Sequence, residues 1–111
     1  MRPLRDEMQT DLTAAMKAGD RTRVSVLRST LAALANAEAV VAPVQKSTPV
    51  AFGTTEVSRR ELDDGDVRAI LSRELDELQT TAIELRSHDR DVEAADLDAR
   101  AGILAEYLHR A

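Results

Sequence analysis

The sequence predicts an all-α fold of about four helices, in which an antiparallel N-terminal helix hairpin packs against a second helix pair. Apolar residues recur at helical spacing in four segments of the chain. Aromatic residues make up only 2% of the 111 residues, so the core must consist of Leu, Val, Ile, Met and Ala. Such a core suits helices that pack through aliphatic ridges, whereas a β-sandwich needs more aromatic and β-branched bulk. The length indicates a single small domain, or part of a larger ancestral one.

The helix hairpin is expected over residues 3–39. Its first helix begins at Pro3, a residue that is tolerated in a first turn, and ends at Gly19. Asp20 is of the type that caps the next helix by accepting hydrogen bonds from its free amides. The apolar positions of the first helix follow i, i+4 spacing: Leu4, Met8, Leu12, Ala15 and Met16.

The segment 21–38 is expected to form the central helix, because it is apolar on two opposite sides and needs neighbours on more than one face. At about 100° per residue, one side carries Val24, Leu27, Leu31, Leu34 and Ala35. The opposite side carries Val26, Ala33 and Ala37. Between the two sides runs a narrow polar seam, formed by Arg21, Ser25, Arg28 and Asn36.

A long loop is expected over residues 40–62, which contain Pro43, Pro49 and Gly53 among Ser, Thr and Val. Loops of this length are uncommon in a compact domain. An alternative is a short strand formed by residues 40–41 and 50–52.

The second helix pair is expected over residues 63–109. The acidic run 63–66 favours a helix start, because carboxylates are stabilised at the positive end of the helix dipole. This third helix ends around His88, and Asp89 or Asp91 caps the fourth. The third helix carries its apolar stripe at Val67, Ile70, Leu71, Leu75, Leu78, Ala82 and Leu85. The fourth carries Val92, Ala95, Ala99, Ile103, Leu104, Tyr107 and Leu108, with Asp96–Arg100 and Glu106–Arg110 as i, i+4 ion pairs.

Composition and charge narrow the classes of function. The chain has no cysteine, which excludes disulfides, thiolate chemistry and Cys-based zinc sites. No segment resembles a signal peptide or a membrane span, so we expect a cytoplasmic protein without a membrane partner. Residues 63–111 carry thirteen Asp or Glu against six Lys or Arg. Because such a surface repels phosphates, we expect no DNA partner, and any RNA contact must come from the first half of the chain.

The polar seam allows two interpretations. Arg21 and Arg28 lie close to a whole number of helical turns apart, so they could hold an anion such as phosphate. Alternatively, Arg28 pairs with an acid of the second half, Glu74 or Glu77, as arginines at the edge of a core usually do. Other cations lie near the seam, but no aromatic residue accompanies them, so base stacking is not expected.

No catalytic residues, metal site or cofactor are predicted. The sequence His88-Asp89-Arg90-Asp91 places a histidine beside carboxylates, and we interpret it as a polar, capped turn rather than as a metal or acid–base site. Serine and threonine hydroxyls in the second helix have no histidine or lysine at a motif-like spacing. A glycine-rich phosphate loop is also lacking in the sequence.

Four stretches of the chain resemble the YqeY-like family. The run Arg23-Val-Ser-Val-Leu-Arg28, followed by Leu31, Ala32, Ala33, Asn36 and Glu38, is similar to the family's signature. Residues 12–21 resemble its opening helix, residues 61–75 its capped third helix and residues 103–108 its closing element. The resemblance covers the N-terminal helical part of the family, and we expect the family's second small helical subdomain to be missing.

The resemblance implies an accessory role linked to transfer RNA. The same kind of domain forms the tail of GatB, the B subunit of the glutamine-dependent aminoacyl-tRNA amidotransferase, where other domains perform the carbon–nitrogen ligation. The implied partners are tRNA or amidotransferase subunits, contacted through Lys17, Arg21, Arg23 and Arg28. The alternative is a protein-interaction module or homo-oligomer without an RNA role.

Overall fold

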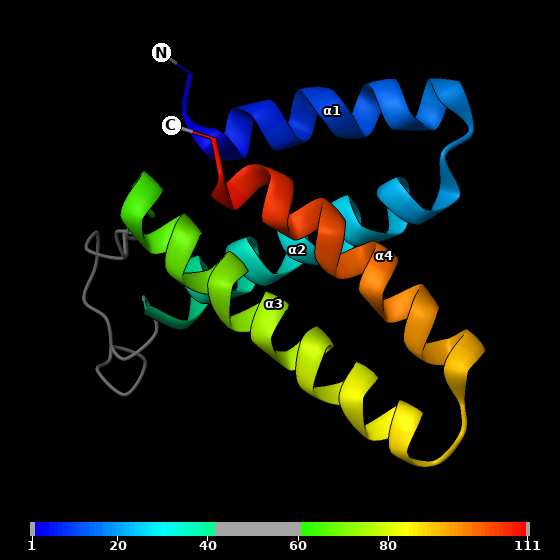
Figure 1. The fold of residues 1–111 in the computed structure, drawn as a ribbon. Helices are drawn as coiled ribbons and strands as arrows, with labels where there is room; N and C mark the ends of the chain where they lie inside the picture. The colour runs from blue at the N-terminus through cyan, green and yellow to red at the C-terminus, as the bar shows by residue number, and fades with distance from the viewer. Residues whose placement is uncertain (1, 42–60, 111) are drawn as a thin grey trace, which may run out of the picture.

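Four helices make up the described part of the chain, residues 2–41 and 61–110 of the computed structural model. They are α1 (Leu4–Ala18), α2 (Arg21–Val41), α3 (Asp64–Ser87) and α4 (Asp91–Leu108). Helix α1 forms a hairpin with α2, and α3 runs alongside α4 (Figure 1). Helix α2 contacts each of the other three helices, as predicted, and so does α3. The all-α fold of two helix pairs is thus confirmed.

The predicted turn of the hairpin at Gly19 and Asp20 is confirmed by its capping geometry, whereas α2 continues to Val41, beyond the predicted end of the hairpin at residue 39. Pro3 precedes α1, and Gly19 ends it in the left-handed conformation (φ 74°), which a residue without a Cβ adopts at no steric cost. Asp20 caps α2, because its Oδ1 accepts a hydrogen bond of 3.1 Å from the amide of Arg23. The tight turn between these caps lets α1 fold back on α2 (Figure 1).

The start of α3 is fixed by a capping box. The amide of Asp66 donates to Asp63 (2.8 Å), and the amide of Asp63 donates back to the Asp66 carboxylate (3.1 Å). Asp64 reaches further and accepts a hydrogen bond of 3.1 Å from the amide of Leu4. A free amide of the first turn of α1 is thereby satisfied by a side chain of α3, which joins the two helix starts.

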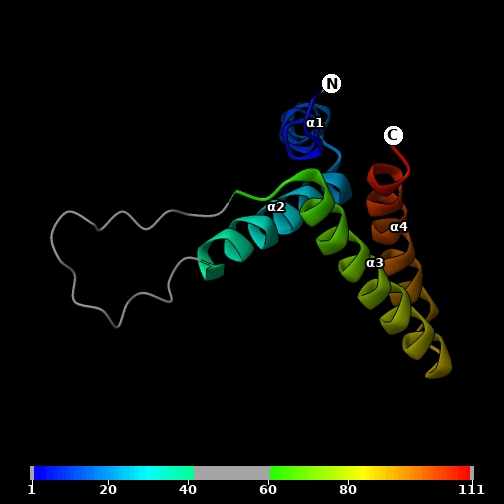
Figure 2. The ribbon, with the colours of Figure 1, turned by 90° about the vertical axis from the view of Figure 1, so that its left-hand side faces the viewer.

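The core lies where all four helices meet. Its fully buried side chains come from every helix, and α2 contributes from both of its apolar sides, at Val26 and at Leu27. The cluster consists of Leu4, Met8, Val26, Leu27, Leu34, Val67, Leu71, Ile103, Leu104 and Tyr107. Met16 and Ala35, both expected on an apolar face, are exposed instead, Met16 to 46%. The end of α2 extends away from α3 and α4 (Figure 2).

The predicted apolar stripe of α4 is wrong in its first half. Val92 is 85% exposed and Ala95 and Ala99 are exposed, whereas Ala94 and Ala101 are buried. Alanine occurs on several sides of this helix, so helical spacing alone allows two stripes that differ by a small rotation. Contact with α3 selects one of them.

The predicted cap of α4 is also wrong. Arg90 occupies the capping position without a side-chain hydrogen bond, and Asp89 lies in the turn with a φ of 61°. Of the two predicted ion pairs, Asp96–Arg100 is present at 3.1 Å. The pair Glu106–Arg110 is not, because both side chains have partners on other helices.

Helix α2 reaches Val41, so a strand that includes residues 40–41 is wrong. The rest of that alternative, residues 50–52, and most of the predicted loop lie outside the described residues. Glu38 links the end of α2 to two other segments: it pairs with Arg5 at 2.7 Å and accepts a hydrogen bond from the amide of Leu62. None of the helices described is both long and apolar enough to cross a membrane.

Candidate functional site

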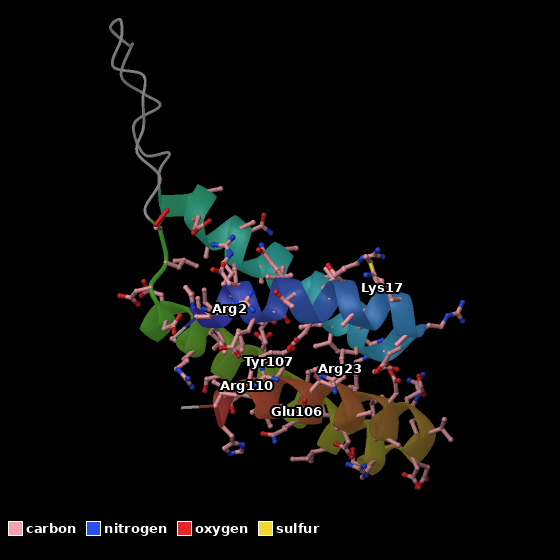
Figure 3. The ribbon with its side chains drawn as sticks, turned by 90° about the horizontal axis from the view of Figure 1, so that it is seen from above. Arg2, Lys17, Arg23, Glu106, Tyr107 and Arg110 are labelled. Carbon is pink, nitrogen blue, oxygen red and sulfur yellow. The ribbon has the colours of Figure 1, made fainter. Side chains whose placement is uncertain are left out.

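Three predicted site residues form a basic edge at the turn between α1 and α2. Lys17, Arg21 and Arg28 are all exposed, and we call these three residues the basic edge. Arg21 and Arg28 border an open depression of about 800 Å³, whose other lining residues are Met16, Gly19, Val24, Ser25 and Ser29. Lys17 lies in the last turn of α1, at the opposite end of that helix from Arg2 (Figure 3).

The expected pairing of Arg28 with Glu74 or Glu77 is wrong. Arg28 Nη2 lies 3.3 Å from the sulfur of Met16, and Glu74 accepts a hydrogen bond of 3.3 Å from the hydroxyl of Thr30. Thr30 follows Arg28 by two residues, which turns the helix by about 200°. When Thr30 faces α3, Arg28 therefore faces the far side of α2.

Arg23 is separated from the basic edge by its partners. Its guanidinium donates to both carboxylate oxygens of Glu106 on α4 (3.1 and 3.2 Å) and lies 3.6 Å from Asp20. The hydrogen bonds with Glu106 raise the pKa of Arg23, outweighing the effect of burial. Arg23 thus connects α2 to α4. Because Glu106 and Asp20 neutralise its charge, it is not available to bind an anionic ligand.

Of the remaining seam residues, Ser25 lines the same depression as Arg21 and Arg28, whereas Asn36 lies apart from the basic edge. Ser25 is half-buried and accepts a hydrogen bond of 3.0 Å from Arg100 Nη1 of α4. Asn36 is exposed, but it lies eight residues beyond Arg28, about 12 Å along the helix. The predicted seam is thus divided into an exposed cationic part and a part that packs against α4.

A second candidate site, which sequence reasoning missed, is a cavity of about 320 Å³ where α2 crosses α3 and α4. Its lining combines apolar residues, hydroxyls, two carboxylates and one guanidinium: Val26, Ser29, Thr30, Glu74, Glu77, Leu78, Thr81, Leu97, Arg100 and Leu104. Burial raises the pKa of Glu74, and the charge of Glu77 raises it further, against the hydrogen bond from Thr30. The one signal in the sequence was Thr30, a polar residue among the apolar positions of α2.

A polar network at the end of α4 was also missed. Tyr107 is 0% exposed, and its hydroxyl donates a hydrogen bond of 2.5 Å to Asp11 of α1. The guanidinium of Arg110 lies 4.2 Å from the centre of the tyrosine ring and pairs with Glu7 at 2.8 Å (Figure 3). Burial raises the pKa of the Tyr107 phenol, so it stays protonated as the donor to Asp11.

No metal site is apparent in the part of the chain that the structure describes, where no three His, Cys, Asp or Glu residues are grouped to hold an ion. His88 and His109 are both exposed, one after α3 and the other after α4. The neighbourhood of His88 is a polar turn, as interpreted from the sequence, although neither aspartate caps α4.

Comparison with known proteins identifies no family: no protein-family model matches the chain, and no curated protein matches it. The resemblance to YqeY-like proteins therefore stays a prediction. The basic edge and the cavity between α2, α3 and α4, which we call the three-helix cavity, are the two features from which a function can be inferred.

Proposed function

We propose that this protein is a non-catalytic accessory domain of the YqeY-like type, which contacts tRNA through its basic edge in glutamine-dependent amidation. The observation that supports an RNA contact is that three cationic side chains of the described chain are exposed and unpaired with carboxylates. Among the residues described, Lys17, Arg21 and Arg28 are exposed and form no ion pair with a carboxylate. Cations that keep their full charge at the surface can displace counterions from a phosphate backbone.

The distribution of charge favours one orientation of a bound nucleic acid. Helices α3 and α4 carry most of the acidic residues of the chain, and phosphates are repelled from them. The basic edge lies at the turn between α1 and α2. An RNA backbone that approaches this end gains attraction and keeps its distance from the acidic pair.

The expected contact is with phosphate rather than with bases. Tyr107, the aromatic residue that the structure describes, is fully buried and unavailable for stacking. The flexible side chains of Arg21 and Arg28 border an open depression, which suits contact with a phosphate backbone regardless of base sequence. We therefore expect binding that depends on tRNA shape and charge.

The proposal is tested by charge reversal on the basic edge. A variant with Arg21→Glu and Arg28→Glu should keep its fold, because both side chains are exposed, and should lose the mobility shift of tRNA at low salt. Arg73→Glu is the matched control, since Arg73 is an exposed arginine of α3 outside the basic edge. Equal shifts with the wild type and the double variant would contradict the proposal.

A native pull-down from cell lysate, with and without ribonuclease, tests the link to amidation. We expect tRNA in the untreated sample, and amidotransferase subunits that are lost after ribonuclease treatment. Partners that persist after ribonuclease, without any recovered tRNA, would contradict an RNA-mediated role.

The second candidate function is a protein-interaction or self-associating module. Two exposed large apolar residues on the second helix pair favour it: Val92 at 85% and Ile83 at 69% exposed. A stable dimer in light scattering that becomes monomeric with Val92→Lys or Ile83→Lys would support this function over RNA binding.

A further inference from the structure

The cavity between α2, α3 and α4 is partly open to solvent and has the size of a binding site for a small molecule. Its volume of about 320 Å³ lies at the lower end of the range of ligand pockets, roughly 300–1,000 Å³. Each of the three helices contributes to its lining, so the cavity exists only in the folded chain. At about 30 Å³ per water-sized group, it accommodates a molecule of about ten non-hydrogen atoms.

The lining of the cavity is divided into an apolar and an acidic part. Side chains of all three helices supply the apolar part, and they are Val26, Leu78, Leu97 and Leu104. Glu74 and Glu77, one helical turn apart on α3, supply the acidic part. The hydroxyls of Ser29, Thr30 and Thr81 lie among them as neutral polar groups.

Neither carboxylate forms an ion pair in the described part of the chain. Within the described chain, Glu74 accepts one hydrogen bond, from Thr30, and Glu77 forms no hydrogen bond or ion pair. Arg100, the cation of the lining, donates instead to Asp96 (3.1 Å) and Ser25 (3.0 Å). Burial and the charge of Glu77 raise the pKa of Glu74, and these effects outweigh the hydrogen bond from Thr30 and the charge of Arg73. The folded protein therefore holds two carboxylates at this cavity, and neither is in an ion pair among the described residues.

We propose that the cavity binds a small organic cation, a protonated amine on an apolar chain. The ammonium group contacts Glu74 and Glu77, and the apolar chain covers the leucines of the lining. Charge complementarity selects a cation, because each carboxylate gains a charge-assisted hydrogen bond that the protein itself does not supply. The apolar lining selects an organic molecule over a hydrated metal ion, which would need further oxygen ligands.

This site is separate from the basic edge. Arg28 faces the far side of α2 from Thr30, and the two hollows share only Ser29 on their borders. The inference does not depend on the RNA proposal, and either one can fail without the other.

A titration with hexylammonium, followed by the amide resonances in NMR, tests the inference. At about pH 8, where carboxyl groups are ionised, we expect saturable shifts confined to the helix segments that line the cavity. Hexan-1-ol has the same apolar chain without the charge, and should bind about tenfold more weakly or less. Shifts that do not saturate, or that spread over all the acidic residues of α3 and α4, would overturn the proposal.

Two variants and a control identify the carboxylates. Glu77→Gln removes the charge of an exposed side chain that forms no hydrogen bond or ion pair within the described chain, so the fold is retained, and we expect hexylammonium binding to weaken about tenfold. Glu74→Gln keeps an oxygen acceptor for Thr30 and should weaken binding as much. Glu84→Gln makes the same charge change at an exposed position of α3 outside the cavity, and should leave binding unchanged. Equal affinity of the Glu77→Gln variant and the wild type would refute the site.

Discussion

At the scale of single residues, the contact between Thr30 and Glu74 connects the interior of the bundle to the cavity. Thr30 is 1% exposed, and its hydroxyl is satisfied by donating to Glu74. A buried hydroxyl without a partner destabilises a protein by about 1–3 kcal/mol. Glu74 is therefore held at the cavity both by helix α3 and by this hydrogen bond, even though its carboxylate is incompletely solvated.

Glu74 makes the stability of the protein depend on pH. The pKa of Glu74 is raised in the folded state, so between its unfolded and folded values the native state binds more protons than the unfolded state. Stability then falls as the pH rises through this window. The charged groups around it are Arg73 and Glu77 on α3, together with Arg100 of α4, which lines the same cavity.

We therefore expect Glu74→Gln to raise the melting temperature at neutral pH, and to have a smaller effect below the unfolded pKa of glutamate, about 4.3. Thermal unfolding followed by circular dichroism at several pH values measures this difference. The control is Glu84→Gln, whose melting temperature should follow the wild type at every pH. A lower melting temperature for Glu74→Gln at neutral pH would show that the carboxylate stabilises the fold.

At the scale of helices, α4 packs along α3 and places Ile103, Leu104 and Tyr107 in the core, and its C-terminal end adds polar contacts to other helices. Tyr107 and Arg110 reach Asp11 and Glu7 of α1, while Arg68 of α3 donates to the carbonyl of Leu108 at 2.9 Å. The C-terminal carbonyls of α4 are thereby capped by a cation, which also suits the negative end of the helix dipole. The contacts of Tyr107 and Arg110 with α1 bring together residues about 100 positions apart in the sequence.

Removing the hydroxyl of Tyr107 tests this connection. Tyr107→Phe keeps the ring in the core and deletes the hydrogen bond to Asp11, so we expect a loss of about 1.5–3 kcal/mol in the free energy of unfolding. Urea unfolding measures the change. An unchanged midpoint of unfolding would mean that the network does not contribute to stability.

The register of α4 is tested by a matched pair of substitutions. Ala94 is fully buried and its neighbour Ala95 is exposed. Ala94→Leu should overpack the contact with α3 and destabilise the protein by about 1–3 kcal/mol, whereas Ala95→Leu should change stability by less than about 0.5 kcal/mol. The opposite order in urea unfolding would support the stripe that was expected from the sequence.

The elements that could be predicted are those specified by neighbouring residues. Gly19 and Asp20 define the turn of the hairpin, and the run 63–66 defines the start of α3, because caps act within one helical turn. The register of α4 could not be predicted, since alanines on several sides leave its orientation to contacts with α3.

The candidate site was predicted only in part. That Arg21 and Arg28 share an exposed strip follows from helix geometry. Which of the neighbouring cations stays unpaired depends on tertiary contacts: Arg23 meets Glu106, which lies 83 residues later in the sequence. The three-helix cavity could not be predicted at all, because it arises where α2 crosses the other pair.

At the scale of the whole molecule, charge is separated between the two helix pairs. The net charge is −5, but residues 1–39 carry six Lys or Arg and five Asp or Glu, while the acidic excess lies in residues 63–111. Ion pairs such as Arg23–Glu106 and Arg110–Glu7 connect the two helix pairs, and the charges of these arginines are thereby neutralised within the fold. The cations of the basic edge, near the turn between α1 and α2, remain exposed and outside these ion pairs.

The salt dependence of tRNA affinity tests the central claim most directly. For wild-type protein, we expect the logarithm of the association constant to fall linearly with the logarithm of the salt concentration, with a slope of about −2 to −3 for the three cations of the basic edge. The Arg21→Glu, Arg28→Glu variant should bind more weakly, with a slope reduced by about 2. Identical slopes and affinities for the two proteins, or no measurable affinity of the wild type at low salt, would contradict the claim.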